Sequence, residues 1–145
     1  MSEQPELLYD DLQLGREFPV FEYPVTPELV DLFIGATGDD NPLYKDAARC
    51  KAEGLSGVLA PTGLAGIFGR LSYLQNHRMP PGGILAKQEM DFLNPFYVGE
   101  TLQVQAAVVD RMIKKEKKYV TIESVAKRPD GEKVAVVRVT AIWPK

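Results

Sequence analysis

The second half of the chain contains four segments in which apolar and polar residues alternate, with short turns between them. In the second segment, Leu102, Val104, Ala106 and Val108 fall on one face of an extended strand, because successive side chains point to opposite sides. Strands that each have one apolar face favour an antiparallel sheet with one buried side. The segments cover residues 84–93, 101–113, 118–128 and 133–143.

The turns between these segments are also predictable. Pro129-Asp130-Gly131 is typical of a tight turn and predicts that the last two segments form a hairpin. Residues 114–118 hold four lysines around Glu116 and are expected to be a solvated hairpin tip. A second interpretation of this basic run is attraction of an anionic ligand, such as the phosphates of coenzyme A.

The first half of the chain predicts three helices and one short strand, over residues 16–24. Thr26 as N-cap and Pro27 at the first helical position start the first helix, and Gly38 helps to end it. A short second helix is expected over residues 45–53. The third is expected to be the longest, from Pro61 to His77.

Gly63, Gly66 and Gly69 recur every three residues within the third helix. Each glycine in a helix costs about 0.5–1 kcal/mol relative to alanine, so the repeat requires an explanation. Close packing of this helix face against a sheet is one explanation. An N–H group of Gly63 left open to a ligand is a second, compatible one. A curled antiparallel sheet around one helix, the α+β hot-dog fold, accommodates this order of elements.

Composition limits the function classes. The net charge of −3, from 17 basic and 20 acidic residues, argues against a nucleic-acid-binding protein. Cys50 is the single cysteine, which indicates a reducing compartment and no cysteine-rich metal site. The sequence shows no secretory leader and no membrane-spanning run, so a cytoplasmic protein is expected. No metal or cofactor is expected, and residues 1–145 are expected to form one domain.

Three motifs occur in order along the chain: residues 39–44 (Asp-Asp-Asn-Pro-Leu-Tyr), residues 57–63 (Gly-Val-Leu-Ala-Pro-Thr-Gly) and residues 92–102 around Asn94-Pro95. Together they resemble the MaoC-like (R)-specific enoyl-thioester hydratases, and the resemblance spans residues 15–143. In that family the first motif reads Asp-x-Asn-Pro-x-His, so Tyr44 stands in the place of the histidine. Ala60-Pro61 resembles the amino-terminal or non-catalytic type of subunit.

The resemblance implies that the chain binds an acyl thioester of coenzyme A or of an acyl-carrier protein. It implies that Asp39 is the catalytic aspartate and that Tyr44 takes the second catalytic position. Asn41 is then the residue that shapes the loop, while Thr62 and Gly63 bind substrate, the Gly63 N–H receiving the thioester oxygen. Without the resemblance, Asp39 is interpreted as a turn-forming residue.

The presence of Tyr44 in place of the family's histidine is a severe change for this chemistry. Hydration needs a group that accepts and returns a proton, whereas an ordinary tyrosine has a pKa near 10 and is a poor base at neutral pH. Loss of one partner of an acid/base pair costs on the order of 10²- to 10⁴-fold in rate. The third helix, from Pro61 to His77, is expected to be roughly 24 Å long, so His77 is expected at the opposite end of it from Gly63. Cys50 is expected to be a structural thiol.

The sequence leaves four functions open. The first is a subunit of a hydratase or dehydratase that relies on a second hot-dog subunit for a complete Asp/His dyad. The others are a self-sufficient homodimeric hydratase using Asp39 and Tyr44, a hot-dog thioesterase, and a ligand-binding module without activity. A homomeric or heteromeric dimer is expected, because one curled sheet leaves open edges. Trp143 is expected in the core or in a subunit interface.

Overall fold

The computed structural model of the protein describes residues 3–144, so the ends of the expected single domain, Met1, Ser2 and Lys145, lie outside the described residues. Five strands form one sheet in the order β1-β3-β4-β5-β2, and every neighbouring pair is antiparallel. The four alternating segments of the second half are therefore strands, as predicted. The strands are β1 Phe21–Pro24, β2 Ile84–Phe92, β3 Thr101–Lys114, β4 Lys117–Lys127 and β5 Lys133–Trp143.

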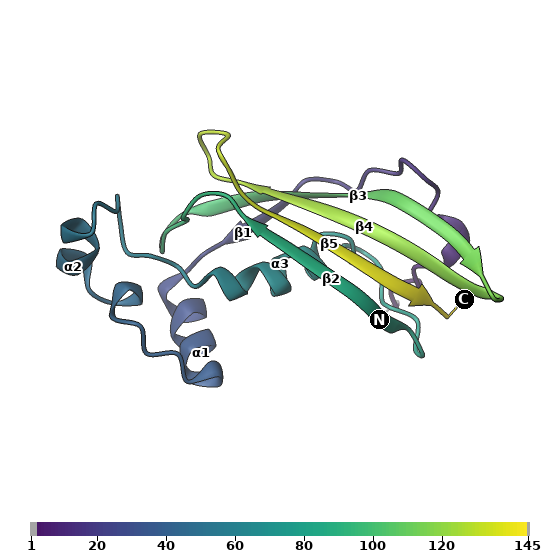
Figure 1. The fold of residues 1–145 in the computed structure, drawn as a ribbon, viewed down its shortest axis with the longest axis horizontal. Coiled ribbons are helices and arrows are strands. Elements are labelled where there is room, and N and C mark those ends of the chain that lie inside the picture. Colours follow the sequence, from purple (N-terminus) through teal and green to yellow (C-terminus); the bar gives the residue numbers. More distant parts are fainter. Residues whose placement is uncertain (1–2, 145) are drawn as a thin grey trace.

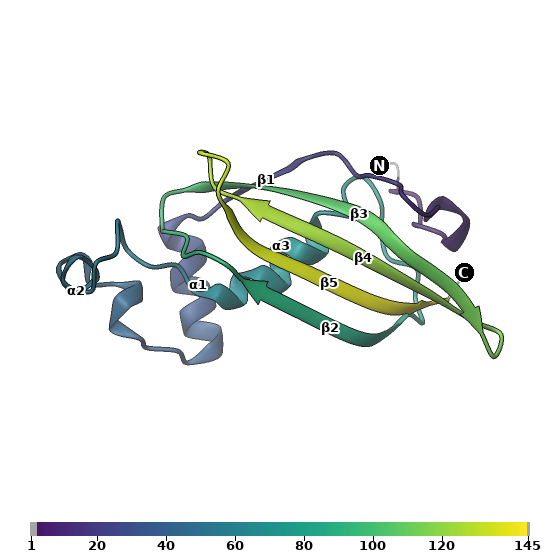
Figure 2. The same ribbon diagram turned by 45° about the horizontal axis from the view of Figure 1, so that its top comes forward.

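The helices lie on one side of this sheet and beyond one of its ends. Figures 1 and 2 show the sheet curving over α3, with α1 and α2 past the end of the strands. This is the α+β hot-dog arrangement that the sequence predicts. The helices are η1 Tyr9–Asp11, α1 Pro27–Thr37, η2 Pro42–Tyr44, α2 Ala47–Ala52, η3 Thr62–Leu64 and α3 Ala65–Leu71, where η denotes a 3₁₀ helix. None of the helices within residues 3–144 is long and apolar enough to cross a membrane.

The first helix begins and ends as predicted, whereas the second begins two residues later and ends one residue earlier than the predicted range 45–53. The Thr26 hydroxyl accepts a hydrogen bond of 3.1 Å from the Leu29 N–H, which satisfies one of the free donors at the start of α1. Gly38 ends that helix with a φ of 71°, a conformation that favours glycine. Asp46 caps α2 in the same way, at 3.0 Å from the Arg49 N–H.

The third helix is shorter than predicted. It stops at Leu71, so α1 is the longest helix, and the expected helix up to His77 is wrong. The buried Ser72 hydroxyl donates to the Gly69 carbonyl at 2.7 Å and lies 2.9 Å from the Ser124 hydroxyl of β4. These contacts hold a turn against the sheet, and the chain then packs into a second core. His77 consequently lies in a loop, and its interpretation as a helix-terminal residue is also wrong.

Both predicted turns in the strand region are present. The β3–β4 turn places Lys115 and Glu116 at φ values of 51° and 66°, so the basic run is a hairpin tip. In the β4–β5 turn, the Gly131 N–H donates to the Arg128 carbonyl at 2.9 Å. Two tight turns therefore join β3, β4 and β5 into a continuous antiparallel meander.

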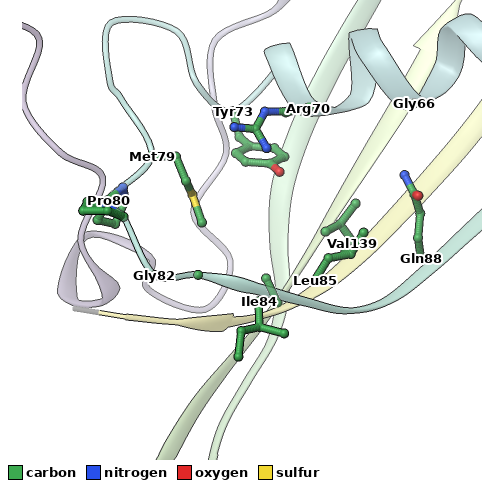
Figure 3. A pocket seen from close by; sticks show the side chains of 13 residues that line it. Gly66, Arg70, Tyr73, Met79, Pro80, Gly82, Ile84, Leu85, Gln88 and Val139 are labelled. Carbon is green, nitrogen blue, oxygen red and sulfur yellow. The ribbon is translucent and has the colours of Figure 1, made fainter.

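An open groove of about 590 Å³ separates α3 from the edge strand β2. Its walls come from α3, the loop over residues 79–83, β2 and β5 (Figure 3). Strand β2 forms one edge of the sheet, where it pairs only with β5, and its residues are exposed along almost its whole length.

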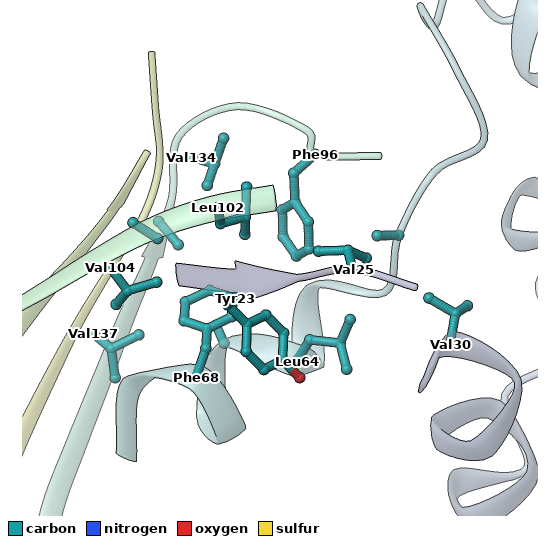
Figure 4. Close-up of a cluster of buried hydrophobic side chains, with 14 of the residues drawn as sticks. Tyr23, Val25, Val30, Leu64, Phe68, Phe96, Leu102, Val104, Val134 and Val137 are labelled. Atoms are coloured by element: carbon teal, nitrogen blue, oxygen red, sulfur yellow. The ribbon is translucent and has the colours of Figure 1, made fainter. Parts of the chain in front are cut away.

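The main core lies between α3 and the sheet (Figure 4). Phe68 is fully buried there, with the rings of Tyr23 and Phe96 at 5.4 and 6.0 Å. A Cβ on Gly69 would lie 3.2 Å from Val137 of β5, so the glycine allows the helix to approach the sheet closely. A second core contains Trp143, whose indole N–H donates to the Leu7 carbonyl at 2.7 Å.

Candidate active site

The motif at residues 39–44 follows directly after α1 and forms a compact turn. The Asp39 carboxylate accepts a hydrogen bond from the Asn41 N–H at 3.2 Å, and the Asn41 side chain accepts one from the Leu43 N–H at 3.1 Å. The second contact caps η2, which begins at Pro42. Aspartate and asparagine therefore shape this segment by ordinary turn chemistry, and they hold Asp39 in an exposed position.

Tyr44 lies against Asp39, so the structure brings the two predicted catalytic residues together. Burial raises the pKa of Tyr44 above its ordinary value, and the charge of Asp39 and a hydrogen bond to it raise that pKa further. A hydrogen bond to Asn41 opposes these effects only in part. Tyr44 therefore carries its proton at neutral pH and can act as a donor beside the carboxylate.

Tyr44 also lines a hollow of about 300 Å³ between α1, η2 and the segment that leads to α3. One side of the tyrosine packs against the main core, and the remainder faces this hollow. The hollow gives a small ligand access to the Tyr44 side chain. Its other lining residues are Pro27, Val30, Asp31, Lys45, Val58 and Val98.

The carbonyl of Leu43 ties the motif to the rest of the fold. It accepts hydrogen bonds from the Leu59 N–H at 3.1 Å and from the Cys50 thiol at 2.9 Å. Cys50 is fully buried, which suits a structural thiol. Ala60, which follows Leu59, is also fixed in place, because its N–H donates to the Phe96 carbonyl at 2.9 Å. Asp39 and Tyr44 are thereby positioned relative to the segment that enters α3.

Thr62 and Gly63 lie at the start of η3, directly before α3, and both are exposed. No side chain caps this helix start. Within residues 3–144, no hydrogen bond joins Asp39 or Tyr44 to either residue, and the two segments are linked by the hydrogen bond from the Leu59 N–H to the Leu43 carbonyl.

Phe33 of α1 is a residue of this region that the sequence did not indicate. Its ring lies 2.7 Å from the position that a Cβ on Gly63 would take, so residue 63 has no room for a side chain on that side. In the sequence, Phe33 is one of several apolar residues of the first helix and has no distinguishing motif. Its contact with a residue far along the chain depends on how α1 and α3 pack.

Two other sequence features do not join the site. His77 lies in the loop after α3, and the neighbouring Arg78 pairs with Glu6 of the amino-terminal segment at 3.2 Å. In the part of the chain that the structure describes, no three His, Cys, Asp or Glu side chains are grouped to hold a metal ion.

Comparison with known proteins gives a family match over most of the chain. The model of the family described as "FAS1-like, dehydratase domain region" matches residues 12–137. No curated protein matches the sequence.

Several solved structures share the fold. R-hydratase PhaJ1 from Pseudomonas aeruginosa has a TM-score of 0.81 and 21% identity, over 97% of this chain and 87% of that chain. A MaoC-like dehydratase from Rhodospirillum rubrum has a TM-score of 0.79 and 24% identity, over 96% and 98% of the two chains. The HadBC (3R-hydroxyacyl-ACP dehydratase) complex from Mycobacterium tuberculosis has a TM-score of 0.75 and 18% identity, over 89% and 96%.

Proposed function

The chain belongs to the family of FAS1-like dehydratase domain regions, and on this basis we propose that it is a subunit of an acyl-thioester hydratase or dehydratase. The observation that carries the proposal is the contact between Asp39 and Tyr44 beside an accessible hollow. The likeness in fold to R-hydratase PhaJ1 and to the 3R-hydroxyacyl-ACP dehydratase complex supports the same reaction class. The substrate is an enoyl or 3-hydroxyacyl thioester of coenzyme A or of an acyl-carrier protein.

The reaction places three demands on the site. In hydration, a base removes a proton from water, the resulting hydroxyl group bonds to C3, and an acid delivers a proton to C2. Negative charge develops on the thioester oxygen during the reaction. Asp39 supplies the carboxylate that accepts the water proton, and the phenol of Tyr44 supplies a proton donor. The N–H groups of Thr62 and Gly63 at the uncapped start of η3 are the donors for the thioester oxygen.

The weak point of this site is the return of the proton. A group that shuttles protons works best when its pKa is near the operating pH, and both burial and Asp39 move the pKa of Tyr44 away from neutrality. We therefore propose that efficient turnover depends on a second hot-dog subunit that supplies a complete Asp/His dyad. The fold similarity to HadBC, which is a complex, supports such an assembly.

Other features support proposals on the cellular location, the domain organisation and the cofactors of the protein. The single buried Cys50 agrees with a reducing compartment, and we place the protein in the cytoplasm. The two core clusters lie under one continuous sheet, which supports a single domain over residues 1–145. Neither step of the proposed chemistry uses a metal or a cofactor.

The test is hydration of a short 2-enoyl-CoA by the purified chain, followed by loss of enoyl absorbance, with Asp39→Asn as the control. We expect binding of the thioester and a rate that is low until a hot-dog partner carrying the Asp/His dyad is added. Full activity of the chain alone, abolished by Asp39→Asn, would instead establish a self-sufficient hydratase. Release of free thiol would identify a thioesterase, and binding without any reaction in the presence of the partner would identify a binding module.

A further inference from the structure

The groove between α3 and β2 carries a second inference, which rests on the proposed function. Its walls combine apolar and polar surface, and the apolar part includes Met79, Leu85 of β2, and Val139 and Ala141 of β5. A volume of about 590 Å³ is large enough for an extended acyl group. The apolar part of this groove suits the hydrocarbon part of a thioester substrate.

Three polar side chains interrupt the apolar part of these walls: Arg70 of α3, Tyr73 just after it, and Gln88 of β2. Figure 3 shows Arg70 next to Tyr73, with Gln88 across the groove. Burial raises the pKa of the Tyr73 phenol, and the nearby positive charge of Arg70 partly offsets that rise. The guanidinium group and the phenol therefore lie close together at one end of the groove.

Arg70 is exposed and, like Arg16, Arg49 and Arg111, forms no ion pair within residues 3–144, but it is the one of these four that lines the groove. Arg78, Arg128 and Arg138 each form an ion pair with a carboxylate. The side chains of Arg70 and Gln88 form no ion pair or hydrogen bond within residues 3–144. A cation beside apolar walls without a protein counter-ion leaves several strong donors available to a ligand.

The position of Arg70 along the helix relates it to the proposed thioester site. Gly63, Gly66 and Arg70 are three and four residues apart, so they share one face of η3 and α3. Seven helical rises place Arg70 roughly 10 Å along the axis from Gly63. An acyl chain with its thioester oxygen at the Gly63 N–H and its carbons in the groove would bring its far end to Arg70.

We propose that this groove selects acyl thioesters whose far end is a carboxylate, with Arg70 as the counter-ion and Gln88 as an additional donor. A guanidinium group recognises a carboxylate through two parallel hydrogen bonds, which gives both affinity and orientation. A neutral acyl chain of the same length would fill the apolar part of the groove and leave Arg70 unpaired. The preference for the charged chain should be about tenfold or more, as expected for hydrogen bonds between charged groups.

The test compares the binding of two thioesters that differ only at the far end, suberoyl-CoA and octanoyl-CoA, by titration calorimetry. We expect the protein to bind suberoyl-CoA more tightly by about tenfold. Arg70→Met should remove this preference and leave octanoyl-CoA binding intact, because methionine keeps the helix and the apolar stem. Arg49→Met, at an exposed arginine of α2 outside the groove, should retain the preference.

The outcomes separate the two proposals. Equal binding of both thioesters, or a preference that persists in Arg70→Met, would overturn the role of Arg70 and leave the proposed function standing. Failure of the folded protein to bind either thioester would overturn both. Arg70→Lys provides a further check, since lysine keeps the charge but loses the paired hydrogen bonds and should retain only part of the preference.

Discussion

The Asp39 carboxylate and the Tyr44 phenol are in contact, and both the charge of Asp39 and the hydrogen bond between the two groups raise the pKa of Tyr44. Burial of the tyrosine is the largest cause of that rise. The pair therefore combines a carboxylate with a phenol that keeps its proton at neutral pH. Such a pair can bind and polarise a water molecule, but it lacks a group that exchanges protons readily.

Replacement of Tyr44 by histidine should increase hydration by the isolated chain. An imidazole with an ordinary pKa near 6.5 can accept and return a proton at neutral pH, and we expect a gain on the order of 10²-fold. The measurement is the loss of enoyl absorbance with a short 2-enoyl-CoA. Asp39→Asn in the same background should remove the gain, and equal rates for Tyr44→His and Tyr44→Phe would contradict the assigned role.

Asp39→Asn should lower the pKa of Tyr44, because it removes a negative charge and weakens a hydrogen bond that both raise that pKa. The measurement is phenolate absorbance against pH, with Tyr44→Phe identifying the component due to this tyrosine. An unchanged titration curve in Asp39→Asn would show that burial alone sets the pKa.

The same shift affects stability at alkaline pH. The folded state holds the Tyr44 proton more tightly than the unfolded state does, so the free energy of unfolding should fall as pH rises beyond about 10. Tyr23 and Tyr73, whose pKa values are also raised, contribute to this fall. Tyr44→Phe should make the fall shallower than in the unaltered protein, as measured by urea unfolding at several pH values.

Gly69→Ala should destabilise the protein, although alanine favours helices. The added methyl group would lie 3.2 Å from the buried Val137, which has little room to move. Overpacking of this kind costs about 1–3 kcal/mol. Gly35→Ala is the matched control in α1, where nothing lies within 4 Å of the new Cβ. It should stabilise the protein by about 0.5–1 kcal/mol in urea unfolding. Equal effects of the two changes would contradict close packing at Gly69.

Glu100→Gln should lower the free energy of unfolding by about 1–2 kcal/mol. The Glu100 carboxylate accepts from the Tyr97 N–H at 2.7 Å and from the Arg128 guanidinium at 2.9 Å, in a half-buried position. Glutamine keeps one acceptor oxygen but loses the charge that pairs with Arg128. Glu89→Gln removes an exposed pair with Lys87 and should have no measurable effect on thermal unfolding. Equal losses for the two variants would contradict this distinction.

The four strands of the second half were predicted closely because their alternation is a direct result of burial on one face, whereas the short strand predicted over residues 16–24 forms only over Phe21–Pro24. Strands β2 to β5 begin and end within one residue of the predicted segments. The third helix was overestimated because Leu74 continues a helical spacing beyond Leu71. Leu74 instead follows a turn and packs against the second core. The contact of Ser72 with Ser124 fixes this turn, and these two residues are far apart in the sequence.

The candidate site also contains both local contacts, which the sequence indicated, and long-range contacts, which it did not. The contact of Asp39 with Tyr44 is local, and the resemblance of residues 39–44 to a family motif had already assigned both residues to one site. The ring of Phe33 beside Gly63 and the position of Arg70 in a groove depend on the packing of α1, α3 and β2. No local pattern in the sequence encodes those contacts.

The order of strands in the sheet has a consequence for synthesis of the protein. The central strands β3, β4 and β5 are consecutive in sequence and can pair through short loops, whereas β1 and β2 must close long loops to reach β3 and β5. We expect the meander to fold first, and pulsed amide exchange that protects α1 before β4 would contradict this. The residues around Asp39 and Gly63 leave the ribosome before the strands that support them. The site would therefore take shape only once nearly the whole chain has been made.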